Sequence, residues 1–182
     1  MRSSKTHSPE ITWAAPVAVA DIPDDGADIA IEANEANRAA IARVAGLRDL
    51  PRLAASFHLS PAGRGEVRVA GHVSAVVGQT CVVTLERVEN LIEEPVDLIF
   101  APAEAVAVRQ DAQGDDAGDD PPEPMVDGKI DLAKLAVEFL ILGIDPYPRK
   151  SGATFETIQA PVDPADHPFA GLASLKPPAE QG

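Results

Sequence analysis

Apolar and polar residues alternate along the middle of the chain with the period of two that is typical of a β-strand with one buried face. The alternation predicts one strand over residues 53–60 and a longer strand over residues 67–77, ended by Gly78-Gln79. Residues 61–65 lie between them, and their proline and two glycines favour a turn. We therefore expect the two strands to form an antiparallel hairpin.

Two further strands are predicted after this hairpin. The first covers Thr80–Arg87 and directs Cys81, Val83 and Leu85 toward the core. The second covers about Glu94–Phe100 and ends where a proline blocks further ladder hydrogen bonds. The inward side chains of this second strand are expected to be Val96, Leu98 and Phe100.

Edge strands and two helices complete the predicted elements. Ile11–Ala20 and Asp28–Glu32 are candidates for a further hairpin or for edge strands, and Pro16 favours an edge position for the first. Asn34–Ala45 is predicted to be a helix with Asn34 as its N-cap, Ile41 and Val44 on the apolar side, and a glycine after it. A second helix starts after the capping Asp131 and ends at Gly143. Its expected apolar stripe consists of Leu132, Leu135, Phe139 and Leu142.

Together these elements predict an α+β fold, a curved antiparallel β-sheet of about four to six strands packed against two main helices. The predicted domain is single and spans residues 10–155. An acidic insertion at about 103–124 is rich in Asp, Gly and Pro, so it buries too little apolar area to offset the entropy lost on ordering. We expect this insertion to be disordered and the Pro-rich tail, residues 156–182, to be flexible.

The net charge of the chain argues against one class of function, the binding of nucleic acid. The formal net charge is −14, from 15 Lys and Arg against 29 Asp and Glu. Because cations must neutralise phosphates in nucleic-acid complexes, this balance disfavours tight, direct binding of nucleic acid. No signal-peptide pattern and no apolar run of about 20 residues is present, so we expect a cytoplasmic protein without membrane contact. The oligomeric state stays open.

Residues that carry chemistry are few and scattered. One cysteine and four histidines show no spacing typical of zinc, which takes about four ligands. Cys81 is interpreted as a small buried core residue. His58 and His72 are expected on the polar side of paired strands, near Ser56 or Ser74, without the nucleophile motif and positioned carboxylate of a catalytic site. We therefore expect no enzymatic activity, no metal and no cofactor.

The segment Asp145–Lys150 is the better functional candidate. Its two prolines restrict the backbone, which lowers the entropy cost of presenting Tyr147, Arg149 and Lys150 to a partner. The alternative is structural, with Tyr147 packed on the sheet and the two cations neutralising nearby acids. Both interpretations stay open at this stage.

Two motifs carry a resemblance to a known family. Residues 71–90, GHVSAVVGQTCVVTLERVEN, and residues 131–155 match in order and spacing. In these segments, over about residues 10–155, the chain resembles the bacterial YceD family, the large ribosomal RNA subunit accumulation proteins, in its alphaproteobacterial form. The positions that carry the family motif are Gly71, Cys81, Leu85, Glu86, Asp145, Pro146, Tyr147 and Pro148.

This resemblance implies a role in accumulation or processing of large-subunit (23S) ribosomal RNA, without an enzymatic activity. Many relatives carry a second cysteine where this chain has Thr84, so no metal or redox role is expected here. The acidic charge favours ribosomal or ribosome-assembly proteins as partners, with direct rRNA contact as a possibility. The alternative function is an RNA-binding module that uses a basic patch of Arg64, Arg68, Arg87, Arg149 and Lys150.

Overall fold

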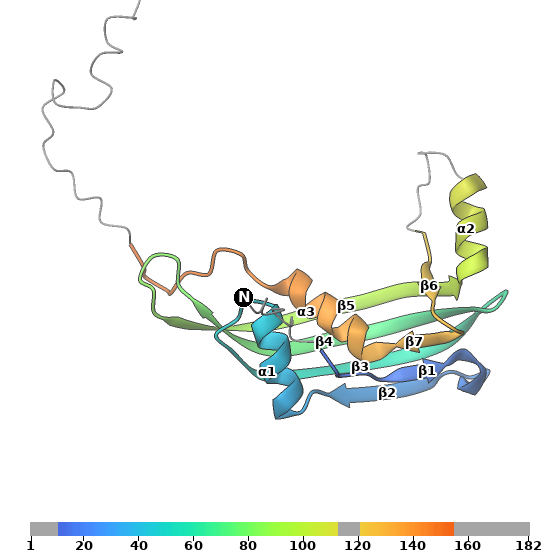
Figure 1. Ribbon diagram of the computed structural model, residues 1–182, viewed down its shortest axis with the longest axis horizontal. Helices are drawn as coiled ribbons and strands as arrows, with labels where there is room; N and C mark the ends of the chain where they lie inside the picture. Colours follow the sequence, from blue (N-terminus) through green and yellow to red (C-terminus); the bar gives the residue numbers. More distant parts are fainter. Residues whose placement is uncertain (1–10, 113–120, 155–182) are drawn as a thin grey trace, which may run out of the picture. The chain divides into compact units, whose positions relative to one another are not determined.

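The computed structural model describes residues 11–112 and 121–154, which contain a five-stranded sheet (Figure 1). The strand order is β2-β3-β4-β5-β6, and all neighbours are antiparallel except β5 and β6, which are parallel. The strands are β2 (Ala27–Glu32), β3 (Asp49–Gly63), β4 (Glu66–Thr80), β5 (Arg87–Pro102) and β6 (Glu123–Met125).

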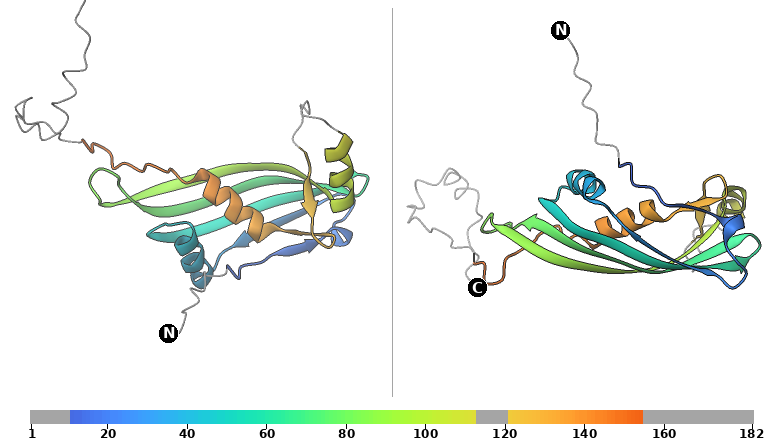
Figure 2. Two further views of the ribbon diagram at one scale, coloured as in Figure 1. Left: turned by 45° about the horizontal axis from the view of Figure 1, so that its top comes forward. Right: turned by 90° about the horizontal axis from the view of Figure 1, so that it is seen from below.

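Two helices lie on the concave face of this curved sheet (Figure 2). Helix α1 (Glu35–Val44) contacts β3, and α3 (Leu132–Gly143) contacts β4 and β5. Within residues 11–112 and 121–154, the opposite face of the sheet carries no helix. The predicted α+β fold with a curved sheet and two main helices is therefore confirmed.

A small second sheet joins the start of the described chain to α3. Strand β1 (Pro16–Ala18) pairs antiparallel with β7 (Lys129–Asp131), and a short 3-10 helix, Val19–Asp21, follows β1. Of the two predicted edge segments, Asp28–Glu32 lies in β2, an outer strand of the large sheet. Ile11–Ala20 contains only the short β1, which belongs to the small sheet and not to the edge of the large one.

Both predicted helix caps are present. The Asn34 side chain accepts a hydrogen bond from the Asn37 N–H at 2.9 Å. Asp131 Oδ1 accepts from the N–H groups of Ala133 at 3.0 Å and Lys134 at 3.3 Å. The same oxygen also accepts from the Ala15 N–H at 2.9 Å, so the cap of α3 ties down the chain that leads into β1.

The core lies between the concave face and the helices. Alternate residues of β3 and β4 are buried there, among them Leu53, Phe57, Val69 and Val73. Gly71 belongs to the same inward row, and a Cβ at this position would overlap the backbone carbonyl oxygen of Ser56 on β3. Glycine thus allows the two strands to approach closely at this point.

Two sequence-based expectations about backbone structure are wrong. Thr80–Arg87 is not a strand, because β4 continues through Thr80 and the chain then reverses in a loop before β5. The acidic insertion is not wholly disordered, since helix α2 (Ala103–Ala112) and β6 occupy its two ends. Residues 113–120 and the predicted flexible tail, 156–182, lie outside the described residues.

The apolar side of each main helix was only partly predictable. In α1, Ile41 is fully buried but Val44 is 48% exposed. In α3, Phe139 is only partly buried and Leu142 is 75% exposed, so the predicted stripe is wrong in its second half. The residues of α3 buried against the sheet are Leu132, Ala133, Leu135, Ala136, Val137 and Leu140.

Candidate functional site

The two motif regions of the sequence meet in space at the loop after β4. We define the Cys81 loop as Cys81–Glu86 and the turn segment as Asp145–Lys150. The Val82 N–H donates a hydrogen bond to the Pro148 carbonyl at 2.9 Å, and Lys150 Nζ donates to Glu86 Oε2 at 2.8 Å. Pro148 is buried in this contact. Side-chain and backbone contacts therefore hold the turn segment against the loop.

The Cys81 sulfur is the centre of this contact. It is fully buried and accepts hydrogen bonds from the N–H groups of Val83 and Thr84, both at 3.4 Å. A third N–H, that of Lys150, donates to the same sulfur at 3.3 Å. The predicted burial of Cys81 is confirmed, and the sulfur also joins two segments that are 69 residues apart in sequence.

A second chain of hydrogen bonds fixes the start of the turn segment. Gln79 Nε2 donates to the Asp145 carbonyl at 2.7 Å, and Asn90 Nδ2 donates to Gln79 Oε1 at 2.8 Å. Asp145 Oδ1 accepts from the Tyr147 N–H at 2.8 Å, which closes a tight turn around Pro146. The turn segment is thus held at both ends by buried or half-buried groups of β4, β5 and the loop.

Hydrogen bonding makes the Cys81 thiol unusually acidic. Contacts with the Thr84 side chain, then with the Thr84 and Lys150 N–H groups, lower the pKa of Cys81 to about 6, although burial opposes the shift. The neighbouring Lys150 lowers the pKa of Glu86, and Glu86 raises that of Lys150. Since both side chains of this ion pair are about half exposed, we assign it little stabilising energy.

The supported segments present an exposed surface, which we call the loop surface: Val82, Leu85, Tyr147 and Arg149. Leu85 is 73% exposed and Tyr147 is 72% exposed. Leu85 also has a φ of 61°, a left-handed conformation that is unusual for a leucine. An apolar side chain that is both exposed and backbone-strained gains little by packing, which points to a use outside the fold.

The turn segment has features of both predicted roles, the presentation of side chains to a partner and a purely structural role. Tyr147 does not pack on the sheet, because most of its side chain is exposed. Lys150 does neutralise an acid, Glu86, as the structural interpretation expected. Arg149 is exposed and has no ion pair with any described residue.

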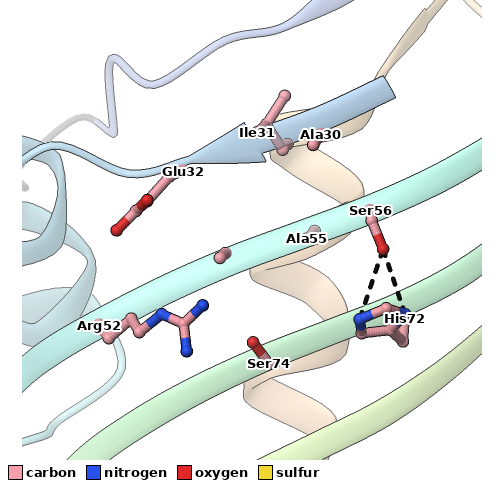
Figure 3. A pocket seen from close by; sticks show the side chains of 9 residues that line it. Ala30, Ile31, Glu32, Arg52, Ala55, Ser56, His72 and Ser74 are labelled. Atoms are coloured by element: carbon pink, nitrogen blue, oxygen red, sulfur yellow. Dashed lines mark hydrogen bonds between the residues drawn. The ribbon is translucent and has the colours of Figure 1, made fainter. Parts of the chain in front are cut away.

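His58 and His72 are the two histidines among the described residues, and both are exposed on the uncovered face of the sheet. His72 Nδ1 is 3.2 Å from the Ser56 hydroxyl, and Figure 3 shows this pair with Ser74 on the neighbouring part of the sheet. The three residues line a hollow of about 420 Å³. His58 is instead 2.8 Å from Asp28 Oδ1. Each of these two histidines therefore has a partner on a neighbouring strand, and the two do not pair with each other.

Metal ligands are similarly scattered in the part of the chain that the structure describes. Within residues 11–112 and 121–154, no group of three or more His, Cys, Asp or Glu side chains lies close enough to hold a metal ion.

The predicted basic patch is not assembled. Arg64 lies in the turn between β3 and β4, whereas Arg87 begins β5 beside the other end of β4. Arg68 is paired with Asp97, and Arg87 is paired with Asp49 and Glu89. The five cations are thus spread along the sheet, and three of them, including Lys150, already have acidic partners.

Sequence reasoning missed several residues of this site. The sequence pattern assigns Gln79 only to a strand end and carries no signal that its side chain is buried and bonds to the Asp145 carbonyl. Leu85 was expected to point inward, because an apolar residue two positions after Val83 fits the period of a strand. The same alternation places Val82 on the outward face, and Val82 is exposed, but nothing in the local pattern indicates that Leu85 would be exposed.

The protein has a mixed α+β fold with an exposed loop surface, an architecture that by itself does not specify a function. Residues 69–176 match the family model of the large ribosomal RNA subunit accumulation protein YceD. This match covers more than half of the 182 residues, and the chain belongs to the YceD family. The match begins and ends further along the chain than the resemblance assigned to residues 10–155.

Family membership implies involvement in the accumulation of large-subunit rRNA. No curated protein and no solved structure matches the chain. No helix among the described residues is long and apolar enough to cross a membrane.

Proposed function

We propose that this protein is a non-enzymatic, cytoplasmic factor in assembly of the large ribosomal subunit, and that it acts by binding ribosomal or ribosome-assembly proteins through the loop surface. The observation that carries the proposal is the position of the family motif. Its two halves meet at the Cys81 loop and the turn segment, where Leu85 and Tyr147 remain exposed.

Physical chemistry supports a protein partner at this surface. Aromatic and aliphatic side chains on a pre-ordered backbone bind with a small loss of conformational entropy. The net charge of −14 favours basic partners, as many proteins that bind rRNA must be. Large-subunit rRNA would then accumulate because its bound proteins assemble correctly.

The test replaces exposed residues of the loop surface in cells whose own gene is deleted. We expect Tyr147→Ala and Leu85→Asn to lower the large-subunit rRNA level and the large-subunit peak in gradient profiles. Both variants should fold, because the two side chains are more than 70% exposed. Asparagine tolerates the left-handed backbone of residue 85, so Leu85→Asn should even raise the free energy of unfolding by about 0.5–1 kcal/mol.

Leu91→Ala is the matched control, since Leu91 is 70% exposed on the outer face of β5, away from the loop surface. This control should complement like the wild type. Normal rRNA levels with both loop-surface variants would contradict the proposed binding surface. Normal levels after deletion of the gene itself would contradict the role in assembly.

A further inference from the structure

A wide apolar groove lies beside α3, separate from the loop surface. Its volume is about 950 Å³, and its walls come from α3, β5 and the segment around β6 and β7. The apolar lining includes Leu98, Phe100, Phe139, Leu142 and Val126. These side chains come from three different parts of the chain and converge on one hollow.

The groove exists because α3 covers only part of the sheet. Val96, on the inward row of β5, is 2% exposed, whereas Leu98 and Phe100 on the same row are only partly buried. On the helix side, Leu142 is 75% exposed and Ile141 is 45% exposed. Helix α3 thus has a second apolar face, which accounts for the half of its predicted stripe that does not pack on the sheet.

Acidic side chains outnumber basic side chains around the groove. Glu123 and Asp127 are exposed on its wall, with Lys129 as the nearby cation. A second lysine, Lys134, is 3.7 Å from Glu138, so this pair adds no net charge. The groove therefore combines an apolar floor with an acidic rim.

We propose that this groove binds an amphipathic helix from a basic protein partner. The helix would lie beside α3 in the layer that covers the concave face, with its apolar side chains on Leu98, Phe100 and Leu142. Its Lys and Arg residues would lie near Glu123 and Asp127. This inference rests on the proposed function only because it takes a protein as the partner. It adds the groove to the loop surface as a second binding site.

The experiment measures the fluorescence anisotropy of labelled synthetic peptides mixed with the purified full chain. One peptide is an amphipathic helix of Leu, Ala and Lys; a second has Glu in place of Lys, and a third has Ser in place of Leu. We expect only the Leu/Lys peptide to bind well. Its affinity should fall by about fivefold or more with Leu142→Gln.

Leu91→Gln is the matched control, because Leu91 has a similar exposure but lies outside the groove. It should change the affinity less than twofold, a change of below about 0.4 kcal/mol. Circular dichroism and thermal unfolding of both variants establish that they fold. A fivefold loss confined to Leu142→Gln supports the proposal.

Several results would overturn it. Equal effects of the two leucine variants, or equal binding of the Ser peptide, would mean that the acidic chain attracts any basic peptide. Equal binding of the Glu peptide would refute the role of the acidic rim. A dimer in light scattering that only Leu142→Gln dissociates would show that a second copy fills the groove. These measurements contain no ribosomal component, so they fail or succeed independently of the rRNA levels that test the proposed function.

Discussion

The buried thiol of Cys81 supports the loop surface, although Cys81 itself is not exposed on that surface. Its sulfur accepts hydrogen bonds from three backbone N–H groups, and Leu85 and Tyr147 in the surrounding segments remain exposed. A smaller apolar residue at this position would leave these donors without partners in a buried place, which is costly. The loop therefore depends on a residue that could be mistaken for core filling.

At this scale we predict a pH dependence of stability. The pKa of Cys81 is lowered from 9.0 to about 6 in the folded protein. Between these values the unfolded state binds more protons, so the stabilisation is full above pH 9, is lost as the pH falls toward 6, and is absent below it.

Urea unfolding of the wild type and Cys81→Ala over this pH range measures the effect. The difference in free energy of unfolding between the two proteins should grow as the pH rises. Parallel curves for the two proteins would contradict a thiolate in the folded state.

The helices and strands follow local signals closely where a cap or an alternation is present. Asn34 and Asp131 were recognised as caps from sequence, and both accept the expected hydrogen bonds. What sequence did not indicate is that Asp131 also binds the Ala15 N–H, 116 residues away. This carboxylate links the small sheet to the start of α3.

We accordingly predict unequal costs for removing the two caps. Asp131→Ala should lower the free energy of unfolding by about 2–3 kcal/mol, because it removes a cap and also leaves the Ala15 N–H unpaired. Asn34→Ala removes a cap alone and should cost about 1 kcal/mol. Chemical unfolding of both variants gives the comparison, and equal losses would mean that the Ala15 contact contributes nothing.

The limits of prediction at the element scale have physical causes. The alternation of β3 and β4 was readable because one face is buried and the other is open to solvent. The Cys81 loop was mistaken for a strand because its turn is made by the sulfur and by the left-handed Leu85, which no residue pattern specifies. Helix α3 is apolar on more than one side, so its sequence could not show which side packs.

At the scale of the whole molecule, the curvature of the sheet determines where α1 and α3 can lie. Gly71 permits the close approach of β3 and β4, and it lies within the range that matches the family model. The candidate site lies at one end of these strands, so its loop is carried by the same hairpins that form the core. The sequence predicts the sheet and identifies the residues of the turn segment. It does not predict that the turn segment contacts Cys81, because this contact joins residues that are far apart in the chain.

We predict that Gly71→Ala lowers the free energy of unfolding by about 1–3 kcal/mol, because the new methyl group must push the Ser56 carbonyl away. Ser74→Ala, on the outer face of the same strand, should change stability by less than about 0.5 kcal/mol. Thermal unfolding of the two variants distinguishes them. A neutral Gly71→Ala would show that the strands can separate there without loss of packing.

The hydrogen bond from Lys150 to the Cys81 sulfur has one more consequence. This hydrogen bond closes a long loop that contains all residues between Cys81 and Lys150. The pairing of β6 with the end of β5 lies within this loop. Because the entropy cost of closing a loop grows only slowly with its length, the 69-residue separation of Cys81 and Lys150 adds little to the cost of forming this contact.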